Sequence, residues 1–488
     1  MADAHLARAA EETFERVGDY DALSFEDRWV RSGELYDRAA RLAGGLREAG
    51  IEPGDRVVVL MANCPEVGIA YNALWRVGAV VTPAIFLLPP AELEHIVSDS
   101  GAKLVLATPE LAANVPEGVT VVTTDEFPSF EETEPSEIVP RAPDDPAALL
   151  YTGGTTGRAK GVLLSHENLW FAGKAGHDAG HLPEITRGLL ALPLSHAFGL
   201  LVTVVGLHAE EQSRTVLMRW FEPTRWLELA REHRTQITAV VPSMLQLLLA
   251  MPLEEYDLSE LRYVVSGGAP LPPRIAHELM RRMPKVEIRE GYGLTESAAL
   301  VSSTPPGQAR LGSVGKPVPG VEVRIDGDED VGEICVRSRS VMLGYWHEPE
   351  ATAEAVKDGW LHTGDLGYLD DDGYLYVVDR TKDLIIRGGF NVYPRDVEEA
   401  IVEHPAVAAA GVVGRPDDAH GEEVVAFVEL HPGQDVSAEE LVSFFKERIG
   451  GYKYPRDVRV IGTLPLTPVG KVDRKALRAR AHLKEAPA

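Results

Sequence analysis

The stretch from Arg56 to Pro83, RVVVLMANCPEVGIAYNALWRVGAVVTP, contains a complete strand–helix–strand unit. Its first six residues, RVVVLM, form an apolar run with the length of a buried strand. A second strand, AVVTP, begins at Ala79. The apolar residues between the two strands repeat at helical spacing: Val67, Ala70, Tyr71, Leu74 and Val77. This order predicts a helix that connects two strands of a buried, mostly parallel sheet.

The same alternation continues on both sides of this unit. Before it, Ser32 is placed to cap a helix that Gly50 ends, and after it a helix from Pro90 to Gly101 leads into the strand KLVLA at Lys103. The apolar face of the earlier helix consists of Leu35, Ala39, Leu42 and Leu46. Residues 109–146, rich in Glu, Asp and Pro, predict a surface connection with one short strand, VTVVTT, at Val119. The predicted fold class is α/β, with doubly wound sheets.

The C-terminal hundred residues have a different pattern. A helix that begins near Pro394 is followed by two strands, AVAAAGVVG from Ala406 and EVVAFVEL from Glu423. A further helix begins with the capping-box pair Ser437 and Glu440. The inward-facing residues of the two helices are Val397, Ile401 and Val402, then Leu441, Phe444, Phe445 and Ile449. This pattern predicts a compact α+β unit.

Charge and composition exclude several classes of partner. The chain has 48 Lys and Arg against 75 Asp and Glu, a formal net charge of −27, which disfavours nucleic acid and anionic membranes as partners. The longest apolar run, residues 198–209, is shorter than the ~20 residues that cross a bilayer, so we expect no stable membrane insertion. Cys64 and Cys335 are too few for a disulfide framework, and the charged start of the chain predicts a helix rather than a signal peptide. We therefore expect a cytoplasmic protein.

One loop has the composition of a phosphate-binding loop. YTGGTTGRAKG, Tyr151 to Gly161, combines glycines, threonines and two cations directly after an apolar stretch. Glycine lets backbone N–H groups approach phosphate oxygens closely, and the cations add charge. The Walker pattern is absent, because Gly157 is followed by Arg158 rather than by Lys and then Ser or Thr. A flexible surface turn explains the glycines but not the threonines and cations, so the loop predicts nucleotide binding.

Further motifs give the chain a family resemblance. SGGAP at Ser266, GYGLTES at Gly291, the long segment GWLHTGDLGYLDDDGYLYVVDRTKDLIIRGGFNVYPRDVEE from Gly359 and PLTPVGKVDRKAL from Pro465 follow the phosphate loop in order. In order and spacing, this set resembles the adenylate-forming enzymes, which include acyl-CoA synthetases, luciferase and peptide-synthetase adenylation domains. The resemblance implies an ATP- and acyl-binding domain over residues 1–381 and a small mobile C-terminal domain over residues 382–488. It also implies a reaction in which ATP converts a carboxylic acid to acyl-AMP and coenzyme A then accepts the acyl group.

The resemblance assigns the nucleotide site residue by residue. The implied β,γ-phosphate loop is Thr152, Gly153, Gly154, Thr155, Thr156, Gly157 and Lys160. The implied adenine site is Tyr292 with Gly291, Gly293 and Thr295, faced by Gly268, Ala269 and Pro270. Asp365 and Arg380 resemble the ribose-binding pair, and Glu296 resembles the Mg²⁺ carboxylate. Taken alone, these could be a core tyrosine, a turn residue, a surface ion pair and an ordinary helix start.

The remaining assignments concern catalysis and the acyl group. Lys471 resembles the catalytic lysine that bridges the carboxylate and the α-phosphate, although a solvated lysine near a basic tail is the simpler interpretation of its sequence context. His196, a second catalytic candidate, could equally be a core histidine. The implied acyl pocket is His196, Phe198, Gly199, Val241, Ser266 and Gly267. No acidic residue stands in LPLSHAFGL to pair an amino group, so we expect an apolar fatty or aromatic acid.

The acceptor and the hinge complete the hypothesis. Gly388, Gly389 and Phe390 resemble the loop that lines the pantetheine tunnel, with a β-turn as the simpler alternative, and Lys382 matches the hinge position. The chain ends soon after Lys471, so we expect coenzyme A as the acceptor. A separate carrier protein and a non-catalytic adenylate sensor are the alternatives, and the joint presence of Lys471, Glu296, Asp365 and Arg380 argues against the sensor. These motifs do not specify chain length or oligomeric state.

Overall fold

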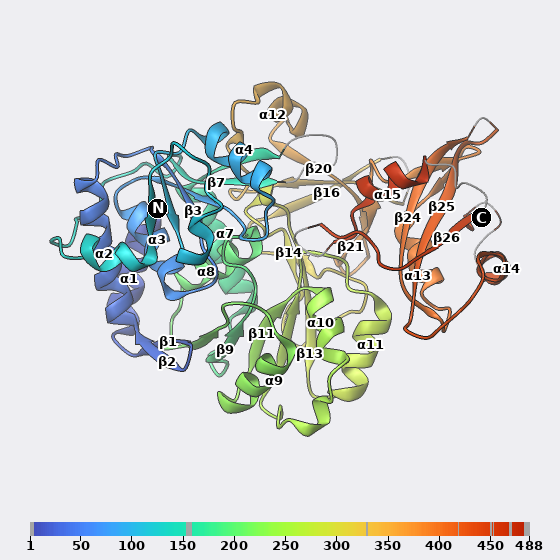
Figure 1. Cartoon of the computed structure of the whole chain (residues 1–488), viewed down its shortest axis with the longest axis horizontal. Coiled ribbons are helices and arrows are strands. Elements are labelled where there is room, and N and C mark those ends of the chain that lie inside the picture. Colours follow the sequence, from blue (N-terminus) through green and yellow to red (C-terminus); the bar gives the residue numbers. More distant parts are fainter. Residues whose placement is uncertain are drawn as a thin grey trace. The chain divides into compact units, whose positions relative to one another are not determined.

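The computed structural model describes residues 4–152, 159–327, 330–417, 419–448, 451, 453–467 and 471–482 (Figure 1). The chain folds into two compact units. The larger unit comprises Met1–Val323, Val336–His362 and Asp371–Leu375, and the smaller comprises Arg324–Cys335, Thr363–Asp370 and Tyr376–Ala488. The predicted α/β class with a large N-terminal and a small C-terminal domain is confirmed. The predicted boundary between residues 381 and 382 stays a prediction.

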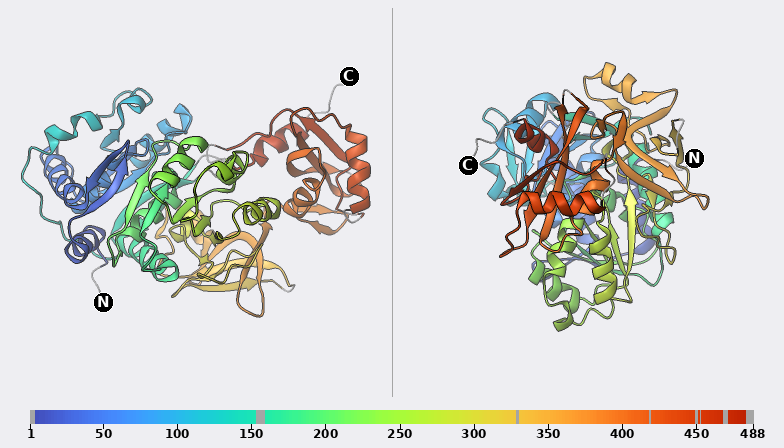
Figure 2. Two further views of the ribbon diagram at one scale, coloured as in Figure 1. Left: turned by 90° about the horizontal axis from the view of Figure 1, so that it is seen from below. Right: turned by 90° about the vertical axis from the view of Figure 1, so that its right-hand side faces the viewer.

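The first sheet of the larger unit contains the strand–helix–strand unit from Arg56 to Pro83. Its strands run in the order β18-β8-β7-β4-β3-β5-β6, and the pairs from β7 to β6 are parallel. The strands are β3 (Arg56–Leu60), β4 (Val80–Pro83), β5 (Leu104–Ala107), β6 (Val121–Thr123), β7 (Pro146–Thr152), β8 (Lys160–Ser165) and β18 (Gly344–Tyr345). Figure 2 shows the N-terminal helices alongside these strands. The helices of this region are α1 (Leu6–Val17), α2 (Ser32–Glu48), α3 (Pro65–Arg76), α4 (Pro90–Ser100), α5 (Pro109–Ala112), α6 (Phe127–Phe130) and α7 (His166–Gly180).

Both faces of this sheet are buried, as the apolar runs predict. Val58 and Leu60 of β3 pack in one cluster with α4. Val57 and Val59, which point to the opposite face, are also fully buried. The doubly wound arrangement therefore follows from strands that have no polar face.

A second sheet, which sequence reasoning did not identify, completes the core of the larger unit. Its order is β15-β14-β13-β12-β11-β9-β10-β1-β2, and the run from β13 to β1 is parallel. The strands are β1 (Asp21–Phe25), β2 (Arg28–Arg31), β9 (Arg187–Leu190), β10 (Arg214–Leu217), β11 (Ile237–Val240), β12 (Tyr263–Ser266), β13 (Glu287–Tyr292), β14 (Ser302–Ser303) and β15 (Lys316–Pro317). Its helices are α8 (Ala197–Gly206), α9 (Pro223–Glu232), α10 (Pro242–Leu249) and α11 (Pro273–Arg282).

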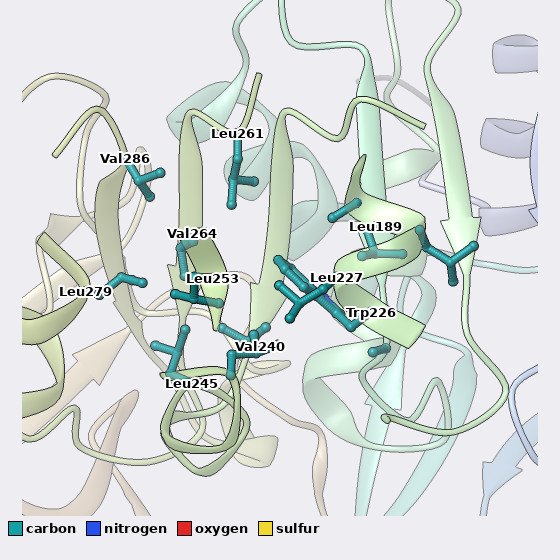
Figure 3. Packing of buried hydrophobic residues seen from close by; sticks show 14 of the residues in the cluster. Leu189, Trp226, Leu227, Val240, Leu245, Leu253, Leu261, Val264, Leu279 and Val286 are labelled. Carbon is teal, nitrogen blue, oxygen red and sulfur yellow. The ribbon is translucent and has the colours of Figure 1, made fainter. Parts of the chain in front are cut away.

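Large apolar side chains fill the space between this sheet and its helices (Figure 3). Trp226 and Leu227 of α9 and Leu245 of α10 pack against Val240 and Val264 of the sheet. The helices thereby hold the carboxyl ends of β11 and β12 in place, and the loops that follow those strands carry several predicted site residues.

A third sheet has the order β16-β17-β20-β19, with β21 paired to β20. Its strands are β16 (Glu322–Asp326), β17 (Gly332–Arg337), β19 (Val356–Lys357), β20 (Trp360–Leu369) and β21 (Leu375–Arg380), and the neighbouring helix is α12 (Pro349–Ala355). No helix in the part of the chain that the structure describes is both long and apolar enough to span a bilayer.

The fourth sheet lies in the smaller unit (Figure 1). Buried apolar clusters cover both of its faces. Alternate residues of β25 divide between two clusters: Val424 and Ala426 pack with α13 and α14, whereas Val425 and Phe427 pack with α15. Its strands are β22 (Ile385–Arg387), β23 (Phe390–Val392), β24 (Val407–Asp417), β25 (Gly421–Leu430) and β26 (Asp457–Ile461), and its helices are α13 (Pro394–Ile401), α14 (Ala438–Arg448) and α15 (Arg474–Ala481). The two predicted strands and two predicted helices are confirmed, while β22, β23, β26 and α15 were missed.

Two local predictions in the N-terminal half were wrong. Ser32 does not cap α2, because its hydroxyl bonds Gly18 O and Tyr20 N instead, and the carboxylate of Asp19 accepts the N–H of Gly33. Residues 109–146 are not merely a surface connection, since Phe127 is fully buried. The strand predicted within that segment is present as β6 and pairs with β5.

A buried ion pair joins β22 to β25 in the smaller unit. The guanidinium of Arg387 donates to both carboxylate oxygens of Glu423, at 2.8 and 3.1 Å, and the two side chains are only 7% and 10% exposed. Removing one partner of such a pair leaves a buried charge without compensation. The pair therefore holds in place the turn that directly follows Arg387.

We expect Glu423→Ala to lower the free energy of unfolding of the smaller unit by about 3–5 kcal/mol, because Arg387 then stays buried without its partner. Native-state hydrogen exchange at the amides of β25 measures this loss. Glu447→Ala is the control, since it removes an exposed partner of Arg448 on α14 of the same unit and should have little effect. Equal, small changes in both variants would show that the buried pair stabilises no more than a surface pair does.

Candidate active site

The stem of the predicted phosphate loop is a two-stranded turn. β7 ends at Thr152 and β8 begins at Lys160, and these two residues face each other across the antiparallel pair. The stem therefore places the hydroxyl of Thr152 and the ammonium of Lys160 at the base of the same loop. The other predicted phosphate-loop residues, Gly153, Gly154, Thr155, Thr156 and Gly157, lie outside the described residues.

Helix α4 fixes both ends of this stem. The hydroxyl of Tyr151 donates to Asp99 at 2.6 Å, and Nε2 of His95 lies 2.9 Å from the carbonyl oxygen of Ala159. Because a carbonyl oxygen only accepts, the imidazole is the donor in the second bond. Burial and Asp99 raise the pKa of Tyr151 well above its usual range, so the phenol stays protonated and continues to donate. One helix thus holds the residues on either side of the predicted phosphate loop.

Tyr345 connects two of the predicted nucleotide-site residues. Its hydroxyl donates to the carboxylate of Glu296 at 2.8 Å, and the ammonium of Lys160 lies 5.2 Å from the centre of its ring. Burial and the charge of Glu296 raise the pKa of Tyr345, so the phenol remains the donor. Sequence reasoning missed Tyr345, because no periodic or spacing pattern links it to Glu296.

The loops after β11, β12 and β13 bring together several predicted acyl and nucleotide residues. A Cβ placed on Gly267 would lie 3.2 Å from the ring of Phe198 and 3.6 Å from the carbonyl oxygen of Gly291. A Cβ on Gly268 would lie 3.5 Å from Val241, and Gly268 has a φ of +78° that favours glycine. Ala269 and Pro270 continue the same loop, and the nearby hydroxyl of Ser266 is buried without a hydrogen-bond partner among the described residues. These contacts create a wall of glycine backbone beside Phe198 and Val241.

Two predicted glycines have a tight-packing role of their own. A Cβ on Gly199 would lie 2.1 Å from the carbonyl oxygen of Pro193, and one on Gly293 would lie 2.2 Å from that of Ala299. Each glycine allows its segment to fold back on itself next to the wall. Tyr292 is the last residue of β13, and Thr295 begins a short 3₁₀ turn that ends at Ser297.

His196 caps helix α8 rather than packing in the core. It is half-buried, and its Nδ1 accepts the N–H of Phe198 at 3.3 Å. A neutral imidazole that accepts at Nδ1 holds its proton at Nε2. The contact orients the ring and places His196 directly beside Phe198.

Three predicted residues lie together in the smaller unit. Nε of Arg380 lies 3.1 Å from the carboxylate of Asp365, whose side chain is 8% exposed. Lys471 as a whole residue is exposed, whereas burial of its ammonium group and the charge of Arg380 lower the pKa of Lys471 to about 8, and Asp365 acts in the opposite direction. The N–H of Lys471 donates to the hydroxyl of Thr467, and the N–H of Thr467 donates to the carbonyl oxygen of Lys471. Asp365, Arg380 and Lys471 thus influence one another, unlike an isolated turn residue, surface arginine and solvated lysine.

The predicted acceptor loop and hinge are also exposed. Gly388 and Gly389 make the turn between β22 and β23 with φ of +60° and +83°, and Phe390 is 57% exposed beside them. Gly388 donates its N–H to the carbonyl oxygen of His420 at 2.7 Å. Lys382 is exposed between β21 and β22, and its carbonyl accepts a hydrogen bond from Arg478 at 3.2 Å. The roles predicted for these residues stay predictions.

Comparisons with known proteins identify the family. Residues 10–346 match the family model described as AMP-binding enzyme, and residues 396–471 match that of the AMP-binding enzyme C-terminal domain. A feruloyl-CoA synthase from an Amycolatopsis species is 38% identical over 462 residues, 92% of this chain and 93% of that protein. A long-chain-fatty-acid–CoA ligase from Bacillus subtilis is 32% identical over 518 residues, 95% of this chain and 92% of that protein.

A solved structure shows the same fold over nearly the whole chain. ATP-bound MatB from Rhodopseudomonas palustris superposes with a TM-score of 0.88 and 31% identity, covering 98% of this chain and 99% of that one. These matches confirm the resemblance on which the site residues were assigned. The chain therefore belongs to the AMP-binding enzyme family, as one of its AMP-forming acid–CoA ligases.

Proposed function

We propose that this enzyme activates an apolar monocarboxylic acid, fatty or aromatic, as its acyl-AMP and then transfers the acyl group to coenzyme A. The observation that carries the proposal is the grouping of Lys471 with Asp365 and Arg380 in the smaller unit. In this group, the carboxylate of Asp365 suits the ribose hydroxyls of a nucleotide. The two cations, Arg380 and a lysine of lowered pKa, suit its α-phosphate. Simple nucleotide binding would not require the lysine.

The first half-reaction joins two anions. A carboxylate oxygen attacks the α-phosphorus of ATP, the bond to the β-phosphate breaks, and pyrophosphate leaves. Lys471 balances the negative charge that the carboxylate and the α-phosphate bring together. Asp365 accepts the ribose hydroxyls, and Arg380 pairs with its carboxylate. Lys160 at the base of the phosphate loop attracts the departing β- and γ-phosphates.

Glu296 suits a magnesium ion. Its carboxylate accepts the Tyr345 hydroxyl on one of two oxygens, and Mg²⁺ in such sites takes one or two carboxylates together with substrate phosphates. When bound, the ion neutralises charge on the phosphates. Tyr345 orients Glu296 for that task, and its ring also faces Lys160.

The preference for an apolar acid rests on the wall beside Gly267. Phe198 and Val241 border the glycine backbone there, and LPLSHAFGL has no acidic side chain to pair an ammonium group. His196 beside Phe198 supports a role at the substrate carboxylate. The relatives named above act on an aromatic and on a long-chain acid, and both kinds fit such a wall.

In the second half-reaction, a thiol attacks the acyl carbonyl and AMP leaves. We propose that the Gly388–Gly389 turn and Phe390 border the pantetheine arm, and that the smaller unit pivots at Lys382 between the two half-reactions. The exposure of all four residues supports these roles. A carrier protein is the alternative acceptor.

A pyrophosphate-release screen tests the function. Hydroxycinnamic acids and straight-chain fatty acids of increasing length are each supplied with ATP and Mg²⁺, with and without coenzyme A, and the products are identified by mass spectrometry. We expect release with one of the two classes and a CoA thioester only when coenzyme A is present. Adenylate formation without any thioester would indicate a carrier protein as the acceptor, and absence of release with every acid would contradict the proposal.

Lys471→Ala should slow adenylate formation by about 10²–10³-fold while thioester formation from supplied acyl-AMP stays near the wild-type rate. The reason is that Lys471 serves the step in which two anions meet, and that step is already complete in acyl-AMP. Single-turnover assays of each half-reaction measure the two rates. A wild-type rate of adenylate formation in the variant would show that Lys471 is not the catalytic lysine.

The pH dependence of adenylation follows from the same lysine. Its pKa is lowered to about 8, so the cation is fully present well below that pH and is lost as the pH rises through it. Because kcat/KM reports the free enzyme, we expect kcat/KM for adenylation to fall above about pH 8. Lys471→Arg is the control, since an arginine keeps its charge and the residual activity should then be level from about pH 7 to about pH 9. An unchanged alkaline limb in that variant would assign the titration to another group.

Tyr345→Phe should weaken binding of Mg²⁺ and ATP together by about tenfold or more, because Glu296 loses the hydroxyl that orients it. Calorimetric titration with ATP, with and without Mg²⁺, measures the effect, and only the titration with Mg²⁺ should change. Tyr36→Phe is the matched control, since it removes another tyrosine–glutamate hydrogen bond, to Glu11, outside the site. If both variants bind alike, Tyr345 does not orient Glu296.

A further inference from the structure

Arg474 lies at the first position of α15, three residues after Lys471, and its guanidinium contacts three carboxylates. Nη2 donates to both oxygens of Glu398, at 2.9 and 2.8 Å. Nη1 lies 3.4 Å from Asp383 and 4.0 Å from Asp379. All of these residues belong to the smaller unit. A single side chain therefore connects the C-terminal helix to two other segments.

Two of those carboxylates, on Asp379 and Glu398, are fixed in turn by backbone N–H groups. Asp379 accepts the N–H of Arg380 at 2.7 Å and the N–H of Arg395, in the first turn of α13, at 2.9 Å. Glu398 accepts the N–H of Val412 on β24 at 2.8 Å. Asp379 and Glu398 cannot follow Arg474 if it moves, because each is tied to a backbone position.

The carboxylates around Arg474 are largely buried, so they need its guanidinium as a countercharge. The side chains of Asp379 and Asp383 are 2% and 4% exposed. Burial raises the pKa of Asp379 and of Glu398, and the charge of Arg474 opposes that rise in both. Arg478 also pairs with Asp383, from the next turn of α15. Without Arg474, Asp379 and Glu398 would lose the cation that opposes the rise in their pKa.

The segments that Arg474 joins carry two of the groups proposed to act on the nucleotide. Lys471 precedes Arg474 by three residues, and Arg380 directly follows Asp379. We propose that Arg474 is a positioning residue for adenylate formation, which fixes the Lys471 loop against the segment that carries Arg380. This inference rests on the proposed role of Lys471. It assigns no contact between Arg474 and the substrates.

Arg474→Met should slow adenylate formation by about 100-fold, since a displacement of about 1 Å at a reacting group can have that effect. The loss should fall on kcat rather than on KM for the acid. Thioester formation from supplied acyl-AMP should stay near the wild-type rate. The alkaline limb near pH 8 should also move to higher pH, because burial is the largest cause of the lowered pKa of Lys471 and a displaced loop would bury its ammonium less.

Arg480→Met is the matched control. It makes the same substitution on the same helix at an exposed arginine, and both half-reactions should be unaffected. Glu398→Gln provides a second variant in case Arg474→Met folds poorly, because the amide oxygen can still accept the N–H of Val412 while Arg474 loses the charge of one of its three carboxylates. We expect Glu398→Gln to reproduce the same selective loss at a smaller size.

Three results would overturn the proposal. In one, both half-reactions fall by the same factor in both cluster variants, in step with the folded fraction measured by circular dichroism, which would make the cluster purely structural. In another, a folded Arg474→Met adenylates at the wild-type rate while Lys471→Ala does not, and only the positioning role is then wrong. In the third, Lys471→Ala itself adenylates normally, and the proposed role of Lys471 fails together with the positioning role.

Discussion

Repulsion between anions is the constraint on which the rest of the proposed site depends. The reaction brings a carboxylate to a triphosphate on a chain whose formal net charge is −27. Cations close to the substrates must therefore outweigh the negative potential of the whole protein. Each of these cations is held by a specific neighbour. In the larger unit the ammonium of Lys160 faces the ring of Tyr345, and in the smaller unit Arg380 pairs with Asp365. Fixed partners let these cations act without reorganising during the reaction.

The smaller unit surrounds its charged groups with two apolar layers. Apolar clusters cover both faces of β25. This strand and the helices packed on it therefore form a rigid frame for the buried ion pairs. Arg387 with Glu423 precedes the Gly388 turn, and Arg474 with its carboxylates joins the segments of Lys471 and Arg380. Buried ion pairs of this kind stabilise little compared with apolar packing, but they define where each segment must lie.

Much of the fold was accessible from the sequence, and some of it was not. Helices α2, α3 and α4 and the strands between them follow from clear helical spacing and continuous apolar runs. The four-residue strands β9 to β12 were missed, whereas β4 and β5, of the same length, were found because helices with clear apolar spacing precede them. Ser32 has the residue type of a helix cap, yet its hydroxyl bonds Gly18 and Tyr20, which approach it from an earlier part of the chain.

The sequence by itself determined the fold class, because that depends on the periodicity of apolar residues. It also contains the ordered motifs through which the chain resembles its family. It also pointed to Lys471, Asp365 and Arg380, although each had a simpler interpretation when taken alone. Only the tertiary structure brought Tyr345 to Glu296, His95 to Ala159 and Arg474 to its carboxylates. Tyr345 and Glu296 are 49 positions apart in the sequence, and Arg474 and Asp383 are 91 apart. Chain folding rather than local pattern decides such contacts, since a hydrogen bond depends on distance in space.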